Sequence, residues 1–221
     1  AVAEAPALPS PFATQTEYHD GFFDLLWIRL VAQRISAAVG AGGAVPEPIT
    51  YDSYVQLAWG LQRGPPEQQR AAVLTVLRSL VPSLFVMAYR LLSPLARRPV
   101  AELSAVMCPP FSKWLVGPAA ATTAEVTLPD GRVETWRSAV KVERCRYLEA
   151  SRCKGACMNL CKVPTETFFA EELGMPLRMT PNFDDLSCEF AFGHAPLPRD
   201  EDPQLKDPCY KECPAAATSF V

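Results

Sequence analysis

The sequence predicts an α+β fold in which an N-terminal helical half packs on a C-terminal, cysteine-rich α+β half of ferredoxin-like type. Apolar residues recur at helical spacing through most of the N-terminal half. Beyond Pro118, an Asp-Gly pair separates two strand-like runs, and seven of the eight cysteines follow. We therefore divide the chain into a helical region, 1–117, and a cysteine-rich α+β region, 118–221, which is expected to bind metal and is called the metal-binding region.

Four helices are expected in the helical region, and glycines or prolines end the first two. Pro82 should kink the third helix, and Arg78 and Arg90 argue against its crossing a membrane. Apolar residues surround most of that helix, so we expect it to be buried or to face a membrane. The expected ranges are 20–39, 51–61, 66–91 and 99–107.

The second region should contain strands and one further helix. Asp130-Gly131 predicts a hairpin between the first two strands. Pro164 is a favourable first residue for the helix, and Gly174 should end it. The expected strands are 125–128, 132–142, 177–179 and 187–192.

Composition excludes several classes of protein. The 221 residues are enough for one large domain or two small ones. Apolar residues make up 49% of the chain, which excludes collagen and wholesale disorder. The 21 basic and 24 acidic residues give a net charge of −3, so nucleic acid is not an expected partner. No secretory signal is visible, although a targeting segment could have been removed.

Three chemistries compete for the cysteines between 145 and 213. Disulfides need an oxidising compartment, and nothing in the sequence indicates secretion. Structural zinc usually uses Cys-x2-Cys pairs, which this chain lacks. The third is an iron–sulfur cluster: Gly155-Ala-Cys157-x3-Cys161 and Cys213-Pro214 are similar to parts of bacterial ferredoxins, but the Cys-x2-Cys steps are missing. The residues alone leave all three alternatives open.

Helix geometry constrains any cluster built from the central cysteines. On one continuous helix Cys153 and Cys161 would be about 12 Å apart, at 1.5 Å per residue. A break at Gly155 could bring Cys153 back, or Cys157 and Cys161 could pair with cysteines of the C-terminal tail. Cys108 stands apart among apolar residues and is interpreted as a packing residue.

Residues 145–165, which read CRYLEASRCKGACMNLCKVPT, closely resemble the plastid β-carotene isomerases of strigolactone biosynthesis, the Dwarf isomerase family. The resemblance covers roughly residues 140–214 and includes Met179-Thr-Pro-Asn-Phe-Asp-Asp-Leu-Ser-Cys188. It implies an iron-containing enzyme that reversibly converts all-trans-β-carotene to 9-cis-β-carotene, the first step towards strigolactones. An algal or divergent member is the expected kind of relative.

With the resemblance, iron is the expected cofactor, and a 4Fe–4S cluster is favoured over mononuclear non-haem iron. His19 and His194 are poor candidates for the two-histidine site that mononuclear iron usually needs. No catalytic residue is assigned. An iron–sulfur electron-transfer protein or a structural metal protein is the alternative function. The expected ligands are Cys153, Cys157, Cys161, Cys209 and Cys213, with Cys188 as a further metal ligand.

The other expectations concern surroundings and partners. The carotenoid substrate implied by the resemblance would meet an apolar surface or tunnel formed by the helical region. Its place in a bilayer implies peripheral membrane contact, released at least in part by salt or carbonate. A downstream carotenoid cleavage enzyme is a further candidate partner, and the resemblance places the mature chain in the plastid after removal of a transit peptide. Asn182, Asp184 and Asp185 are expected to form a turn rather than an acid–base site.

Overall fold

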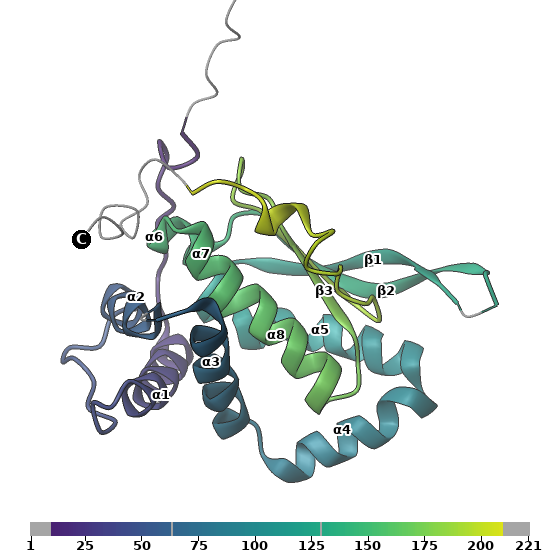
Figure 1. Cartoon of the computed structure of the whole chain (residues 1–221), viewed down its shortest axis with the longest axis horizontal. Coiled ribbons are helices and arrows are strands. Elements are labelled where there is room, and N and C mark those ends of the chain that lie inside the picture. Colours follow the sequence, from purple (N-terminus) through teal and green to yellow (C-terminus); the bar gives the residue numbers. More distant parts are fainter. Residues whose placement is uncertain (1–9, 63, 129, 210–221) are drawn as a thin grey trace, which may run out of the picture.

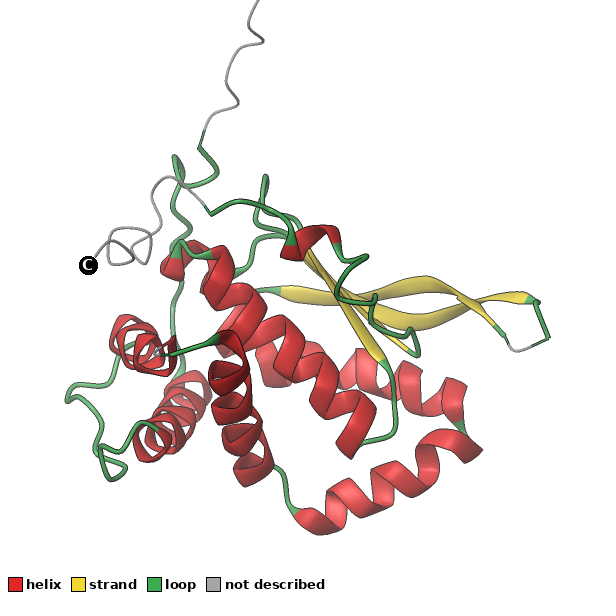
Figure 2. Ribbon diagram, viewed as in Figure 1, coloured by secondary structure: helices red, strands yellow, loops and turns green. Residues whose placement is uncertain are grey.

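The computed structural model describes residues 10–62, 64–128 and 130–209 and confirms the α+β class. The helices gather below and to the left of the sheet in Figure 2, and the hairpin formed by β1 (Ala119–Thr127) and β2 (Val133–Val142) projects beyond them. The first five helices are α1 (Phe22–Ala38), α2 (Tyr51–Trp59), α3 (Pro66–Leu80), α4 (Ser83–Leu95) and α5 (Arg97–Val116).

Local signals set the beginnings of the first helices. The backbone N–H of Gly21 donates to the Asp24 carboxylate at 3.0 Å, which satisfies a donor at the start of α1. At α2, the Thr50 hydroxyl accepts from the backbone N–H of Ser53, and the Ser53 hydroxyl accepts from that of Thr50. Pro66 is the first residue of α3, as expected.

Two predictions for the helical region were wrong in detail. The chain bends at Pro82 as expected, but the bend is a complete break: α3 and α4 are two separate helices that meet at 99°. The helix expected over 99–107 is α5, which continues to Val116 through Pro109 and Pro110. Prolines are unfavourable inside a helix, but α5 packs along β1, β2 and β4 (Cys188–Phe192), and tertiary packing of this kind overrides a low helix propensity.

The four strands form one antiparallel sheet in the order β1-β2-β4-β3. β1 and β2 form the expected hairpin, and β4 pairs with both β2 and β3. Because the described strands are arranged as two strands, a helical segment and two more strands, the sheet does not have the βαββαβ order of a ferredoxin-like fold. The strands are β1 (Ala119–Thr127), β2 (Val133–Val142), β3 (Leu177–Pro181) and β4 (Cys188–Phe192).

The helical segment between β2 and β3 begins earlier than the predicted start at Pro164. After the short helix α6 (Arg146–Ser151), a nearly continuous helix runs from Lys154 to Glu172. It contains α7 (Lys154–Ala156), a wider π-helical turn at Cys157–Lys162, α8 (Val163–Thr167) and a second π-helical turn at Phe168–Glu172. Pro164 therefore lies inside a helix that is already formed. Figure 1 shows this helix lying between α3 and the sheet.

The two regions share one hydrophobic core. Ile28, Tyr54 and Trp114 of the helical region belong to the same buried cluster as Val140 and Phe190 of the sheet. Gly117, with φ +85°, makes the turn between α5 and β1. Among the described helices, none alone is long and apolar enough to cross a membrane; α3 and α4 reach that length and composition only as a bent pair.

Candidate metal centre

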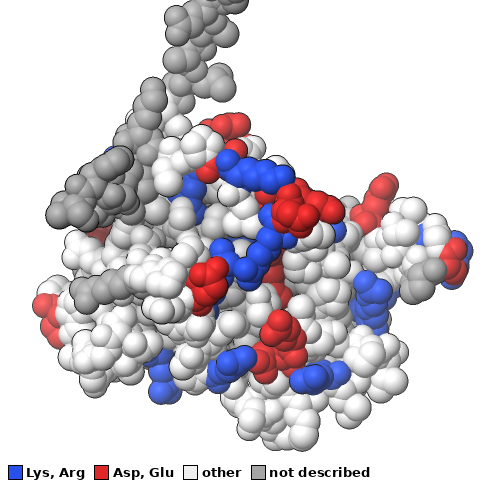
Figure 3. Space-filling model, in the orientation of Figure 1, with Lys and Arg blue, Asp and Glu red and all other residues white. Residues whose placement is uncertain are grey.

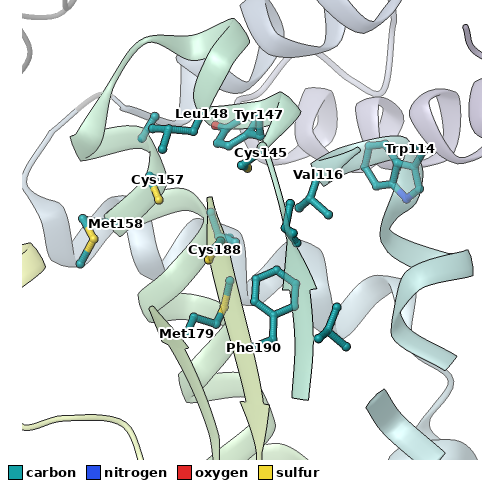
Figure 4. Close-up of a cluster of buried hydrophobic side chains, with 14 of the residues drawn as sticks. Trp114, Val116, Cys145, Tyr147, Leu148, Cys157, Met158, Met179, Cys188 and Phe190 are labelled. Atoms are coloured by element: carbon teal, nitrogen blue, oxygen red, sulfur yellow. The ribbon is translucent and has the colours of Figure 1, made fainter. Parts of the chain in front are cut away.

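Four cysteines from three segments of the metal-binding region line one buried cavity, which we call the four-thiol cavity. They are Cys145, Cys157, Cys161 and Cys188. Figure 4 shows Cys145, Cys157 and Cys188 around a common interior space between the helical segment and the sheet. The cavity measures about 10 Å³, which is room for about one water molecule.

Pairing of β2 with β4 brings Cys145 and Cys188 together. Val142 near the end of β2 is directly opposite Cys188 at the start of β4. Three residues beyond Val142, the backbone N–H of Cys145 donates to the carbonyl of Leu186 at 2.7 Å. The end of β2 and the start of β4 therefore lie side by side. This brings together two thiols that are far apart in the sequence.

Helical spacing places the other two thiols together. Cys157 and Cys161 are four residues apart, which puts them on the same side of a helix. Their turn is π-helical, and such turns occur frequently at functional sites. The sheet side of the cavity is closed by Met179 and Phe190, so the thiols meet apolar surfaces on their remaining sides.

Burial keeps the four thiols protonated. Burial raises the pKa of Cys157, and the neighbouring Cys161, Cys188 and Cys145 raise it further. The same causes raise the pKa of Cys188, while burial and then Cys145 raise the pKa of Cys161 to about 12. Each thiolate would repel the next in this apolar space. Several of these thiols can therefore ionise together only if a positive charge lies close to them.

Lys162 brings one such charge to the cavity wall. It lowers the pKa of both Cys157 and Cys188 against the effect of burial. Its ammonium forms a buried ion pair with Asp202 and a 3.3 Å hydrogen bond to the side chain of Gln204. The exposed fractions of the two charged side chains are only 2% and 3%. This pair joins the C-terminal loop to the helix that carries Cys157 and Cys161.

A buried carboxylic acid lies close to this pair. The Glu166 carboxylate accepts a 2.7 Å hydrogen bond from the backbone N–H of Met179. Burial raises the pKa of Glu166 to about 7, although the Met179 N–H and Lys162 act in the opposite direction. At neutral pH the group therefore exists in both protonation states.

The structure separates the predicted ligands into three groups. Cys157, Cys161 and Cys188 line the four-thiol cavity. Cys153 is the N-cap of α7, where its sulfur accepts from the backbone N–H of Ala156 at 3.4 Å and lies 4.0 Å from the side-chain nitrogen of Gln62. Cys209 is exposed, and Cys213 is outside the described residues.

Sequence reasoning missed Cys145 as a member of this group. The signal for it was its place directly after a buried strand, but the pairing of that strand with β4 is not visible in the sequence. None of the seven cysteines among the described residues takes part in a disulfide.

The chemistry of the donor set suits thiophilic iron, because four sulfurs meet beside one lysine. No group of three or more His, Cys, Asp or Glu side chains within the described residues is arranged to hold a metal ion. The thiols thus face a shared space without closing around one point. Iron would have to deprotonate them and widen the cavity.

Other predicted features have ordinary structural roles. The Nε2 of His194 is hydrogen-bonded to the Glu125 carbonyl at 2.8 Å, away from the cysteines. Asn182 and Asp185 accept hydrogen bonds from backbone N–H groups two residues later, which confirms the expected turn. A larger cavity of about 620 Å³ lies elsewhere and is lined by charged and polar groups that include Asp20, Arg146 and Glu149.

Comparison with known proteins gives concordant results. The family described as "Beta-carotene isomerase D27-like, C-terminal" matches residues 114–201, a range that includes all four cavity thiols. "Beta-carotene isomerase D27, chloroplastic" of Medicago truncatula is 37% identical over 202 residues, which cover 90% of this chain and 75% of that protein. The protein of the same name from Arabidopsis thaliana is 32% identical over 214 residues, covering 96% and 78%. No solved structure matches the chain.

Proposed function

Since this chain belongs to the β-carotene isomerase D27 family, we propose that it is a plastid carotenoid isomerase that reversibly converts all-trans-β-carotene to 9-cis-β-carotene. The product would be the first intermediate on the way to strigolactones. The single observation that carries the proposal is that the four-thiol cavity lies wholly within the range matched by the family. Both relatives are named chloroplastic, which supports the location.

The reaction needs a double bond to lose its order long enough to rotate, with no net change in atoms or electrons. Iron held by the cavity thiols would supply one-electron exchange with the polyene or Lewis-acid polarisation. The chain's own residues would provide the surroundings. Lys162 would offset the negative charge of the thiolates, and the apolar side chains of Met179 and Phe190 would keep water away from them.

We propose Cys145, Cys157, Cys161 and Cys188 as the ligands of an iron–sulfur cluster, because the described chain brings these four together. Cys153, Cys209 and Cys213 stay predicted ligands. The ion pair between Lys162 and Asp202 would hold the C-terminal loop against the helix that carries two of these ligands. A cluster is favoured over a single iron ion because the thiols surround a space and no histidine of the described residues faces it.

The test combines metal analysis with product analysis. Protein purified without oxygen should be brown and contain both iron and acid-labile sulfide. Supplied with either carotene isomer in detergent micelles, it should approach the same isomer ratio by chromatography. Iron without sulfide would indicate the mononuclear alternative, and a brown protein that isomerises nothing would favour an electron-transfer role.

Single variants then assign the ligands. Cys145→Ala and Cys157→Ala should each lose the cluster and the activity. Cys108→Ala is the matched control, because Cys108 lies on α5 beside Ser112, at a sulfur-to-hydroxyl distance of 3.7 Å, and outside the cavity. If Cys153→Ala lost the cluster while Cys145→Ala kept it, the original ligand prediction would be right and the cavity assignment wrong.

A further inference from the structure

Helix α4 places its hydrocarbon side chains outward. Leu84 and Leu95 have exposed fractions of 70% and 76%, and the only buried residue of the helix is Ser93. At 100° per residue, its large exposed apolar side chains cover about 160° of the circumference. They are Leu84, Phe85, Met87, Leu91, Leu92 and Leu95.

The side of α4 that faces the protein carries two hydrogen-bonded hydroxyl groups, and the ring of Tyr89 packs against Phe169. The Ser93 hydroxyl lies within hydrogen-bond distance of the carbonyls of Tyr89, 2.8 Å, and Leu173, 3.2 Å. The Tyr89 hydroxyl is bonded to that of Ser104 on α5 at 2.6 Å. Water-facing helices have the opposite arrangement, with apolar residues towards the core. The sequence of α4 thus suits an apolar medium outside the molecule.

The exposed apolar surface continues onto α5. Leu103, Val106, Met107 and Phe111 are exposed there, and Phe111 contacts Trp27 of α1 with ring centroids 6.1 Å apart. Of all the large exposed apolar side chains in the described residues, only Val133 lies outside α1, α4 and α5. We call the exposed apolar side chains of α4 and α5 the α4–α5 surface. Its concentration on two adjoining helices distinguishes it from scattered surface residues.

Charge around this surface has the opposite sign to that of the whole chain. The net charge of the protein is −3, but α4 and α5 carry four basic residues, Arg90, Arg97, Arg98 and Lys113, and one acidic residue, Glu102. In Figure 3 the lower edge formed by α4 is uncharged, and basic and acidic side chains together run in a row above it. Arg98 is paired with Glu102 and Glu134, and Arg97 donates to the Gly193 carbonyl. Arg90 and Lys113 are exposed and have no ion pair among the described residues, so they are the basic groups that match the headgroups of an anionic bilayer.

We propose that the α4–α5 surface docks the protein on a lipid bilayer that carries anionic headgroups, and that carotene is taken from that bilayer. The proposal rests on the proposed function for its second part only. A bilayer can surround the wide apolar arc of α4, while basic residues beside it reach the headgroups. A second copy of the chain would bring the same basic residues against one another at a symmetric interface.

The experiment measures flotation of the full chain with phosphatidylcholine vesicles, with and without phosphatidylglycerol. The test variant is the double substitution Leu84→Glu/Leu91→Glu. The matched control is Val133→Glu, which adds charge at an exposed apolar residue on the hairpin. We expect anionic lipid to strengthen binding, salt to weaken it, and the double variant to bind at least about tenfold more weakly, while the control binds like the wild type.

Carotene assays separate this proposal from the proposed function. The double variant should isomerise carotene supplied in detergent micelles like the wild type, and fail only with carotene in vesicles. Equal flotation of the wild type and the double variant would overturn the docking surface. Light scattering that shows a wild-type dimer, split by the double substitution, with no flotation, would assign the surface to a second copy. Flotation without isomerisation in either medium would uphold docking and refute the isomerase.

Discussion

The four-thiol cavity and the α4–α5 surface distribute polar and apolar groups in opposite ways. The cavity holds four thiols and one wall lysine inside the protein, where burial raises the pKa of each thiol. The surface holds leucines and phenylalanines outside, while the Ser93 hydroxyl is buried. Soluble proteins rarely tolerate either arrangement without a purpose.

The proposed function would explain both arrangements. A hydrocarbon substrate dissolved in lipid has to be met at an apolar surface and changed at a reactive centre kept from water. Under that proposal the helical region would contribute the first and the metal-binding region the second; the two share one core. Stability measurements can test the contrast. Substitution of a buried side chain should lower the free energy of unfolding strongly, whereas substitution of an exposed side chain of the α4–α5 surface should change it little in water.

The largest effect is expected for the buried ion pair beside the cavity. Asp202→Asn keeps the shape of the side chain but leaves the Lys162 ammonium without its buried counter-charge. We expect a loss of about 3–5 kcal/mol in the free energy of unfolding, measured by denaturant titration. A loss below about 1 kcal/mol would mean that water already reaches Lys162.

The control for this prediction removes both charges. In Lys162→Met/Asp202→Asn both partners of the ion pair are neutral, and only the carboxyl of Glu166 remains nearby to ionise, so much of the stability should return. Recovery of stability without recovery of iron binding would show that Lys162 matters for the thiolates. Recovery of both would reduce the pair to a structural link between the C-terminal loop and the helix.

The second prediction concerns a buried leucine, and the last prediction below treats an exposed one, Leu91, of equal size. Leu148 on α6 is fully buried against the cavity, so Leu148→Ala should cost about 2–5 kcal/mol through lost burial and the cavity that remains. Thermal or denaturant unfolding measures it. A cost near zero would show that the cavity wall is loosely packed. Buried and exposed leucines would then not differ in their contribution to stability.

Much of the fold follows from local signals in the sequence. The Thr50–Ser53 capping box and Pro66 start their helices, and Asp130-Gly131 forms the turn of the hairpin as predicted. The turn at Asn182 was also predicted, because its side chain bonds a backbone N–H nearby. Signals of this kind need only a few neighbouring residues, so a single sequence contains them.

The remaining features depend on contacts between distant segments. The continuation of α5 through Pro109 and Pro110 depends on packing against the sheet. Cys145 reaches the cavity only because Val142 pairs with Cys188. Periodicity also cannot tell whether an apolar helix such as α4 is buried or faces lipid, since both environments favour the same residues.

The third prediction uses the pH dependence of stability. The pKa of Glu166 is raised to about 7, so between the unfolded value near 4.5 and 7 the folded state holds a proton that the unfolded state has lost. Stability from this group is therefore present at low pH and falls as pH rises, by about 2 kcal/mol between pH 5 and 8. Glu166→Gln cannot titrate and should lose this pH dependence in melting temperature. An unchanged pH profile would assign the slope to other groups.

The smallest effect on the free energy of unfolding is expected for an exposed leucine of the α4–α5 surface. Leu91 on α4 has an exposed fraction of 65%, so Leu91→Ser removes little buried area and should change the free energy of unfolding in water by less than about 0.5 kcal/mol. The same substitution should lower vesicle binding, because the leucine is buried only when the protein docks. The two measurements on one variant separate folding from docking. A cost of several kcal/mol in water would show that α4 is covered in the free protein, and the α4–α5 surface would then be part of an interface between protein chains.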